Sequence, residues 1–457
     1  MISRRALLAS LCGTAVAVAV PRSGNAQSPA ISGTGLRGAI DAGTHGVKPG
    51  GGSAMQRKLE RLIADAARQN LPVFLPPGDY PVSGLMLPDG ARLSGIAGAS
   101  RLVQAGSEPL LEARDVQRTV LAGLVFDGVN RPIAGDTAGL IQFRNVANLA
   151  IEDCEVTNSG ASGLRLEGCG GRIERCHILR AKDYALYAVQ SSSLSVANNI
   201  VSACGDGGIL IHRWEKGHDG TIVSGNRISS TGASSGGTGQ YGNAINLYRA
   251  DDVTVSGNQV SESAFSAIRA NSASNAIITD NHCIASGETA IYAEFSFEGA
   301  VISGNLVDGA ANGISVVNFN AGGRLATVAG NIVRNLRLSG PYTVDDPIFG
   351  VGISAEADTA VSGNVIENAP YAGLALGFGP YLRNVTATGN IIRQAGVGCA
   401  VTVVEGSGDV IIANNIFQSA TRGGIIGYRW RDAATGDLAK AGAQAFGHLT
   451  IENNRVS

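Results

Sequence analysis

The chain has little of what several common protein classes need. Only 5% of its 457 residues are aromatic, 16% are charged and three are Met. Lys and Arg total 35 against 37 Asp and Glu, so the basic surplus that nucleic acids and anionic membranes attract is missing. No Cys lies in a CxxC pair, and no Cys/His group has zinc-like spacing. The sequence therefore predicts no nucleic-acid partner, no metal site and no cofactor.

Apolar runs of membrane-spanning length are also missing. The apolar stretch 7–20 is shorter than the ~18–20 residues that a spanning helix needs. It follows Arg4 and Arg5 and ends near Gly24-Asn25-Ala26, an order that resembles a twin-arginine export signal cleaved after Ala26. We therefore expect the twin-arginine export machinery as a partner, and a mature protein that is periplasmic or secreted and does not contact a membrane.

Six cysteines follow the predicted cleavage site. Twin-arginine export delivers an already folded protein, so the fold has to form in a reducing cytoplasm, where disulfides are rare. We expect all six thiols to be small buried side chains, with a late bridge between Cys154 and Cys176 as the less favoured alternative. The six are Cys154, Cys169, Cys176, Cys204, Cys283 and Cys399.

Glycine, by contrast, is abundant, with 63 residues, and it marks a repeated phrase. The phrase Ser-Gly-Asn, with an apolar residue two positions after the Asn, recurs at Asn226, Asn258, Asn305 and Asn364. Looser copies and two cysteines extend the series from 154 to 454 with a mean period of about 27 residues, which is typical of a solenoid. Gly and Asn tolerate left-handed backbone, and stacked Asn side chains can bond along an axis, so we assign these asparagines a structural role.

Each repeat also contains a stretch in which apolar residues alternate with others. Ten residues after the Asn or Cys comes an aliphatic residue, and the pattern from there has period two, as in Ile209–Ile211 and Ile268–Ala270. Shorter apolar runs flank the Asn. Three short strands and three turns per repeat predict an all-β, single-stranded, right-handed parallel β-helix of about 12 coils. Its interior should hold Ile209, Leu247, Ile268, Ile291, Val316 and Ile353.

The N-terminal part has the features of a cap. Residues 53–70 predict an amphipathic helix with Ser53 as N-cap. The phrase Pro76-Pro77-Gly78-Asp79-Tyr80 follows. Helix, phrase, export signal and Gly-Asn repeats together resemble the twin-arginine-translocated bacterial β-helix repeat family of the pectate-lyase-like superfamily. The resemblance implies the fold but no reaction. The predicted organisation is a signal peptide at 1–26, a cap with the first coils at 27–100, and repeats at 101–457.

Two outward columns of the alternating strand carry the chemistry, and we expect them to form a trough. Two coils have long insertions, 230–242 and 335–349, which should wall it, since loops on a rigid scaffold often carry function. The fourth place of the strand gives Glu167, Val189, His212, Tyr248, Asn271, Glu294, Val317, Glu356 and Gly377. The second place gives Arg165, Tyr187, Leu210, Asn246, Arg269, Tyr292, Ser315, Ser354 and Ala375.

Three readings of this trough stay open. Glu294 and Glu356, two coils apart, suit the carboxyl pair of an inverting glycoside hydrolase. Alternatively, Tyr248 or His212 abstracts a sugar proton while Arg269 or Arg249 neutralises a uronate, as in a polysaccharide lyase or epimerase. In the third reading the protein is a non-catalytic carbohydrate-binding or structural repeat protein, in which Arg269 and Glu294 pair across coils.

The predicted partner is a polysaccharide or oligosaccharide, possibly acidic, bound by a monomer. Asn246, Arg249, Arg269, Asn271 and Tyr292 are the predicted substrate-binding residues, and Glu294, Glu356, Tyr248 and His212 the predicted catalytic ones. Variants of Arg269 or Glu294 are expected to lose binding without a loss of stability. The motifs of polygalacturonases and pectate lyases have no match here, so no catalytic residue is carried over from those enzymes.

Overall fold

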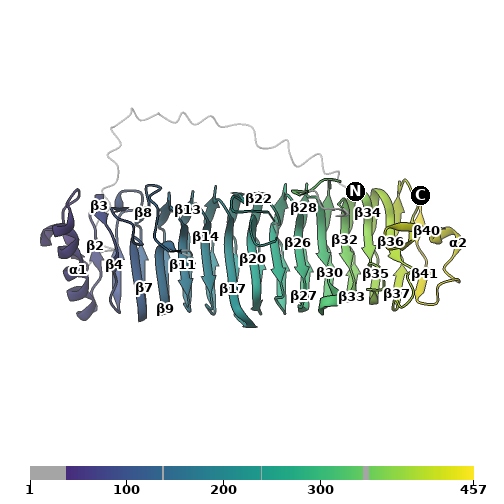
Figure 1. Ribbon diagram of the computed structural model, residues 1–457, viewed down its shortest axis with the longest axis horizontal. Coiled ribbons are helices and arrows are strands. Elements are labelled where there is room, and N and C mark those ends of the chain that lie inside the picture. The colour runs from purple at the N-terminus through teal and green to yellow at the C-terminus, as the bar shows by residue number, and fades with distance from the viewer. Residues whose placement is uncertain (1–37, 136–137, 238, 343–348) are drawn as a thin grey trace, which may run out of the picture. The chain divides into compact units, whose positions relative to one another are not determined.

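The computed structural model describes residues 38–135, 138–237, 239–342 and 349–457. The predicted signal peptide lies outside these residues. Residues 39–457 form one compact unit, in which strands stack side by side along one axis, with α1 (Ser53–Arg68) at one end and α2 (Leu438–Ala441) near the other (Figure 1). Each coil contributes one strand to each of three parallel sheets, as the repeat predicts.

The strands of the three sheets follow one another in chain order, and long strands pass from one sheet to the next. Sheet 1 consists of β4 (Leu85–Met86), the first halves of β7 (Leu111–Ala122) and β9 (Gly139–Glu152), β11 (Ser162–Glu167), β14 (Tyr184–Val189), β17 (Gly207–His218), β20 (Asn243–Asp251), β23 (Ile268–Asn271), β26 (Thr289–Glu294), β29 (Asn312–Val316), β32 (Val351–Ala355), the second halves of β34 (Val365–Leu376) and β36 (Ile391–Thr402), and β39 (Ile425–Arg429).

Sheet 2 consists of β1 (Ile40–Asp41), β2 (Val73–Phe74), β5 (Ala91–Ser94), the second halves of β7 and β9, β12 (Gly171–Glu174), β15 (Leu194–Ala197), β18 (Ile222–Ser224), β21 (Thr254–Ser256), β24 (Ala276–Thr279), β27 (Glu298–Ser303), β30 (Arg324–Ala329), β33 (Ala357–Ser362), β35 (Arg383–Thr388), β37 (Val410–Ala413) and β41 (Leu449–Glu452).

Sheet 3 consists of β3 (Gly78–Val82), β6 (Ser100–Gln104), β8 (Val125–Asp127), β10 (Glu155–Thr157), β13 (His177–Leu179), β16 (Ile200–Ser202), β19 (Arg227–Thr231), β22 (Gln259–Ser263), β25 (His282–Ile284), β28 (Leu306–Asp308), β31 (Ile332–Arg334), the first halves of β34 and β36, β38 (Ile416–Gln418) and β42 (Arg455–Val456).

The register of sheet 1 agrees with the sequence prediction. Asn246 pairs with Leu210 on one side and with Arg269 on the other, and Arg269 pairs with Tyr292. The predicted interior residues are buried as well, with at most 2% of any of them exposed. A strand with one buried face has a side-chain period of two, so a shift by one residue would have turned every polar group inward. Both the columns and the core are therefore confirmed.

A ladder of buried asparagines runs along the turn between sheets 2 and 3. Each Asn Oδ1 accepts from both the backbone N–H and the Nδ2 of the Asn one coil before, at 2.9–3.0 Å for Asn226, Asn258 and Asn281. The residue before each Asn has a left-handed backbone, with φ +64° at Gly225, where glycine carries no steric penalty. The predicted stacking is confirmed, and the Gly-Asn phrase is explained. The ladder comprises Asn199, Asn226, Asn258, Asn281, Asn305, Asn331, Asn364, Asn390, Asn415 and Asn454.

Helix α1 covers the N-terminal end of the core, with Leu59, Leu62 and Ile63 buried beneath it. The predicted cap residue is wrong by one position, because the N-cap is Gly52 and makes no side-chain hydrogen bond there. At the other end β40 (Asp432–Asp437) pairs antiparallel with β39, and α2 follows. All six described cysteines are buried and unbridged, as expected. Within the described ranges no helix has the length and apolarity to cross a membrane.

Candidate functional site

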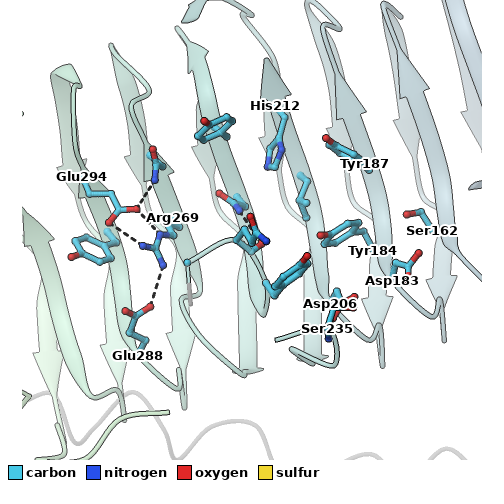
Figure 2. A pocket seen from close by; sticks show the side chains of 18 of the residues that line it. Ser162, Asp183, Tyr184, Tyr187, Asp206, His212, Ser235, Arg269, Glu288 and Glu294 are labelled. Atoms are coloured by element: carbon cyan, nitrogen blue, oxygen red, sulfur yellow. Dashed lines mark hydrogen bonds and ion pairs between the residues drawn. The ribbon is translucent and has the colours of Figure 1, made fainter. Parts of the chain in front are cut away.

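A groove of about 870 Å³ lies on the outer face of sheet 1. Its floor spans the coils from Tyr187 to Tyr292, four strand spacings or ~19 Å. Figure 2 shows Arg269, Glu288 and Glu294 at one end and Tyr187, Asp183, Asp206 and Ser235 at the other, with His212 between them. Seven predicted site residues line this groove, namely His212, Asn246, Tyr248, Arg269, Asn271, Tyr292 and Glu294.

A buried ion cluster closes the C-terminal end of the groove. The Arg269 guanidinium donates to both oxygens of Glu294, with Nε–Oε1 2.6 Å and Nη2–Oε2 3.0 Å, and Nη1 lies 3.3 Å from Glu288 Oε2. Asn271 Nδ2 donates to Glu294 Oε1 at 2.9 Å. Burial raises the pKa of Glu294 more than Arg269 and Asn271 lower it. The pairing of Arg269 with Glu294 across coils, which the sequence left open, is therefore present. Glu288 and Glu294 both bind the Arg269 guanidinium.

Both long insertions are fixed to groove carboxylates. The Tyr342 hydroxyl donates to Glu288 Oε1 at 2.6 Å, and its ring stacks on Phe265 with centroids 6.0 Å apart. At the other end Asp206 accepts from the backbone N–H and the hydroxyl of Ser235, at 2.7 and 2.6 Å. The insertions thus form walls of the groove, as predicted, and buried carboxylates position both of them.

The middle of the floor has polar atoms without partners. His212 lies between the rings of Tyr187 and Tyr248, with centroids 5.2 and 5.5 Å away. Burial, with a smaller contribution from the charge of Arg165, lowers the pKa of His212 to about 3, so the imidazole is neutral. Within the described part of the chain, His212 Nε2 and Asn246 Oδ1 are buried and have no hydrogen-bond partner. A hydroxyl group both donates and accepts, so its hydrogen-bonding capacity matches that of either atom.

The charge of the groove is acidic. Its lining holds four carboxylates, Asp183, Asp206, Glu288 and Glu294, and among the described residues one guanidinium, Arg269, which is already shared by two of them. Burial raises the pKa of Asp183, against the opposing effect of Lys182, and nearby Asp206 raises it further. An anionic ligand would therefore meet repulsion along most of this surface.

The other two predicted residues lie outside the lining. Arg249 faces the far side of Tyr248, its guanidinium 4.9 Å from that ring, and Nη1 donates to the Trp214 carbonyl at 2.6 Å. Glu356 lies between β32 and β33, and its Oε2 accepts from the Phe319 N–H at 2.7 Å. Burial raises the pKa of Glu356 to about 7, although hydrogen bonds from Phe319 and Asn318 oppose the shift.

Glu356→Gln is expected to weaken the pH dependence of stability. The folded-state pKa near 7 lies above the ordinary value of 4.5, so the protonated carboxyl stabilises the fold below about pH 4.5 and loses this effect as pH rises through 7. Between about pH 5 and pH 8 the free energy of unfolding should fall less in the variant than in the parent. Urea denaturation at both pH values measures this, with exposed Glu215→Gln as the control. An equal fall in the free energy of unfolding of the parent and of Glu356→Gln would contradict the raised pKa of Glu356.

Sequence reasoning missed a third column of the same sheet. Asp183, Asp206 and Glu288 each stand three residues before the buried aliphatic residue of their coil, which is Leu186, Ile209 and Ile291 in turn. This places them at the edge from which the insertions emerge. The spacing is present in the sequence, whereas the two predicted columns comprise only strand positions after the aliphatic residue. The sequence places Tyr342 in an insertion and gives no further signal for it.

Comparisons with known proteins support the fold. Residues 129–237 match the family described as a right handed beta helix region, and residues 224–437 match the family described as periplasmic copper-binding protein (NosD). No curated protein matches the chain. The chain is a right-handed parallel β-helix protein, as predicted, and the superfamily resemblance is supported at this level. Membership of the twin-arginine-translocated family stays a prediction.

Two similar solved structures come from bacteriophages. The N-terminal fragment of gene product 12 of bacteriophage phi29 is 16% identical, with 86% of this chain and 71% of that chain covered and a TM-score of 0.53. Tailspike protein 3 of bacteriophage CBA120 is 11% identical, with 92% and 62% covered and a TM-score of 0.51. This chain thus spans less than two thirds of the tailspike. At these identities the similarity shows the fold alone.

The residues present do not fit a copper site. Copper is held in proteins mainly by thiolate, thioether and imidazole groups. Between residues 224 and 437 the chain offers Cys283, Cys399 and His282 and no Met. Both thiols are fully buried, and burial raises the pKa of Cys283 to about 12, which keeps it protonated. The described residues contain no group of three or more His, Cys, Asp or Glu that could hold a metal ion.

Proposed function

We propose that the protein is an exported glycan-binding β-helix protein that holds an oligosaccharide in the groove of sheet 1. The observation that carries this proposal is the middle of the floor, where His212, whose Nε2 has no partner among the described residues, lies between the rings of Tyr187 and Tyr248. Asn246, whose Oδ1 has no such partner either, lines the same groove. Ligand sites commonly combine apolar or aromatic walls with a few fixed polar groups. Sugar rings present hydroxyl groups at their edges and C–H groups on their faces, which matches this combination.

The charge of the groove supports a neutral or amino-bearing glycan over an acidic one. The sequence predicts a possibly acidic polysaccharide, with Arg269 or Arg249 neutralising a uronate. In the structure Arg269 is bound by Glu288 and Glu294, and the remaining carboxylates would repel a uronate. The same arrangement gives the lyase and epimerase readings less support, since a neutral His212 with a pKa near 3 is a weak base.

Glycoside hydrolysis is the second candidate, and Glu356 favours it. A carboxyl whose pKa is raised to about 7 by burial can donate a proton near neutral pH, as the general acid of a glycosidase does. Its predicted partner Glu294 lies two coils away and is ionised within the Arg269 cluster. Glu356 lies outside the groove lining, so this candidate requires a substrate that reaches beyond Glu294.

Location and assembly belong to the same proposal. The match to a family described as periplasmic and the twin-arginine signal predicted at residues 1–26 both support a periplasmic or secreted protein. We propose that it acts as a monomer on a polysaccharide partner.

Calorimetric titration with laminarin (neutral), chitosan (cationic) and alginate (anionic) tests the proposal. We expect laminarin or chitosan to bind more tightly than alginate, and His212→Ala to weaken binding about tenfold, equivalent to about 1.4 kcal/mol. The matched control is His177→Ala, an exposed histidine on sheet 3.

Each outcome separates the candidates. No binding of any of the three polysaccharides contradicts the proposed function, and tighter binding of alginate contradicts the charge argument. A reducing-end assay on the same samples tests hydrolysis. New reducing ends that appear with the parent and are lost in Glu356→Gln would establish the second candidate, whereas unsaturated, ultraviolet-absorbing products would restore the lyase reading.

A further inference from the structure

The exposed aromatic side chains of the described residues all lie along one edge of sheet 1. They are Trp214, Phe295, Phe378 and Trp430, which we call the aromatic edge. Each follows the fourth-place residue of its strand by one or two positions, after His212, Glu294, Gly377 and Tyr428 respectively. With aromatic residues at only 5% of the chain, this clustering on one edge of one sheet marks a binding surface.

The aromatic edge is longer than the groove. Strand pairing places His212 and Glu294 three coils apart, and Glu294 is followed by the coils of Val317, Glu356 and Gly377 and then, two coils on, by Tyr428. Eight spacings of about 4.8 Å give ~38 Å from Trp214 to Trp430. Phe295 lines the groove as well, so the two surfaces are continuous there.

The backbone that carries the aromatic side chains near the groove is held by specific contacts. The backbone N–H of Trp214 donates to Gln190 Oε1 at 3.1 Å. The Lys216 ammonium donates to the Ser296 carbonyl, which ties the strand end that carries Trp214 to the turn that carries Phe295. These contacts fix the backbone beneath both rings, so little ordering is needed when a ligand binds.

The far end of the edge is an aromatic pair. The rings of Phe378 and Trp430 meet edge to face with centroids 5.3 Å apart. The Trp430 ring lies against Gly379, where a Cβ atom would come within 2.5 Å of it, so the glycine makes room for the ring. The pair lies three to five coils beyond Glu294, outside the groove.

We propose that the Phe378–Trp430 pair is a remote sugar-binding subsite and that the natural ligand is a long glycan running along the aromatic edge. The proposal rests on the proposed function of the groove and adds chain length to it. Aromatic faces offer large, rigid apolar contact area for the C–H faces of sugar rings. A short oligosaccharide fills the groove alone, whereas a polymer that leaves the groove past Phe295 also reaches Phe378 and Trp430.

Tryptophan fluorescence tests this directly, because both tryptophans of the chain lie on the edge. In Trp214→Phe the emission comes from Trp430 alone, and in Trp430→Phe from Trp214 alone. We expect laminarin to shift the emission of Trp430 and laminaritriose to leave it unchanged. Trp430→Ala should weaken laminarin binding about tenfold and leave laminaritriose binding unchanged. Ile411→Ala, which removes an exposed apolar side chain from sheet 2, is the control.

The outcomes distinguish the two proposals. Suppose that laminarin binds the parent, does not shift the Trp430 emission and binds Trp430→Ala with unchanged affinity. The remote subsite is then wrong, and the groove proposal stands. If Trp430→Ala weakens the binding of laminarin and of laminaritriose equally, the proposal that binding at this pair depends on glycan length is wrong. If none of the three polysaccharides binds in calorimetry, the groove proposal and the remote subsite are both wrong.

Discussion

Replacing Asn331 with alanine is expected to lower the free energy of unfolding by about 4 kcal/mol, through breaking a buried hydrogen-bond network. Its Nδ2 donates to the Ile302 carbonyl and to Asn364 Oδ1, each at 3.0 Å. Its Oδ1 accepts from the backbone N–H and the Nδ2 of Asn305, also at 3.0 Å. The substitution leaves the buried backbone N–H of Asn305 without its acceptor, which costs about 1–3 kcal/mol. It also removes one hydrogen bond, at about 1 kcal/mol each, from Asn305 Nδ2, Asn364 Oδ1 and the Ile302 carbonyl.

Denaturation in urea, followed by circular dichroism, measures the loss. Asn320→Ala is the matched control, since this asparagine is exposed in the 3₁₀ turn Phe319–Ala321. Surface substitutions of this kind usually change stability by about 0.5 kcal/mol or less. A loss below about 1 kcal/mol in Asn331→Ala would show that the ladder is not a main source of stability.

The architecture was predictable because one period governs backbone, core and turn together. The Ser-Gly-Asn phrase repeats where the left-handed turn and the buried amide are both needed, so the sequence states the coil length directly. The alternation around Ile209 and Ile268 then shows which side chains of the strand point inward and which outward. Parallel pairing in register repeats this orientation in each coil. Seven groove residues could be identified in this way because they occupy two columns of that strand.

The state of the site was harder to predict, because it depends on pairing between side chains rather than on their columns. The sequence places Arg269 and Glu294 in adjacent coils but does not say that Glu288, which precedes its strand, also reaches the guanidinium. Nor does a column say which way an insertion folds, and it therefore does not predict that the Tyr342 hydroxyl donates to Glu288. Glu356 shares the column of Glu294, yet it turns toward the Phe319 N–H.

Arg269→Ala should cost about 3–5 kcal/mol at neutral pH, because it leaves two buried carboxylates without their partner. Glu288 and Glu294 are 5% and 2% exposed, and each has an oxygen within 3.3 Å of the Arg269 guanidinium. The sequence alone predicts unchanged stability for this variant, because it assigns Arg269 to ligand binding and not to a buried ion cluster. Arg334→Ala, which removes an exposed ion pair with Asp308, is the control and should cost less than about 1 kcal/mol.

The pH dependence of that loss identifies its cause. Burial already raises the pKa of Glu294, and removing the Arg269 charge that opposes this shift raises it further, so the protonated carboxyl stabilises the variant at low pH and this advantage is lost as pH rises. The difference in unfolding free energy between parent and variant should therefore grow from about pH 4 to pH 8. Adding Glu288→Gln and Glu294→Gln to Arg269→Ala should recover much of the stability, because no buried charge then remains unpaired. A loss that is independent of pH and is not recovered in the triple variant would assign the effect to lost packing against Tyr292, whose ring lies 5.1 Å from the guanidinium carbon.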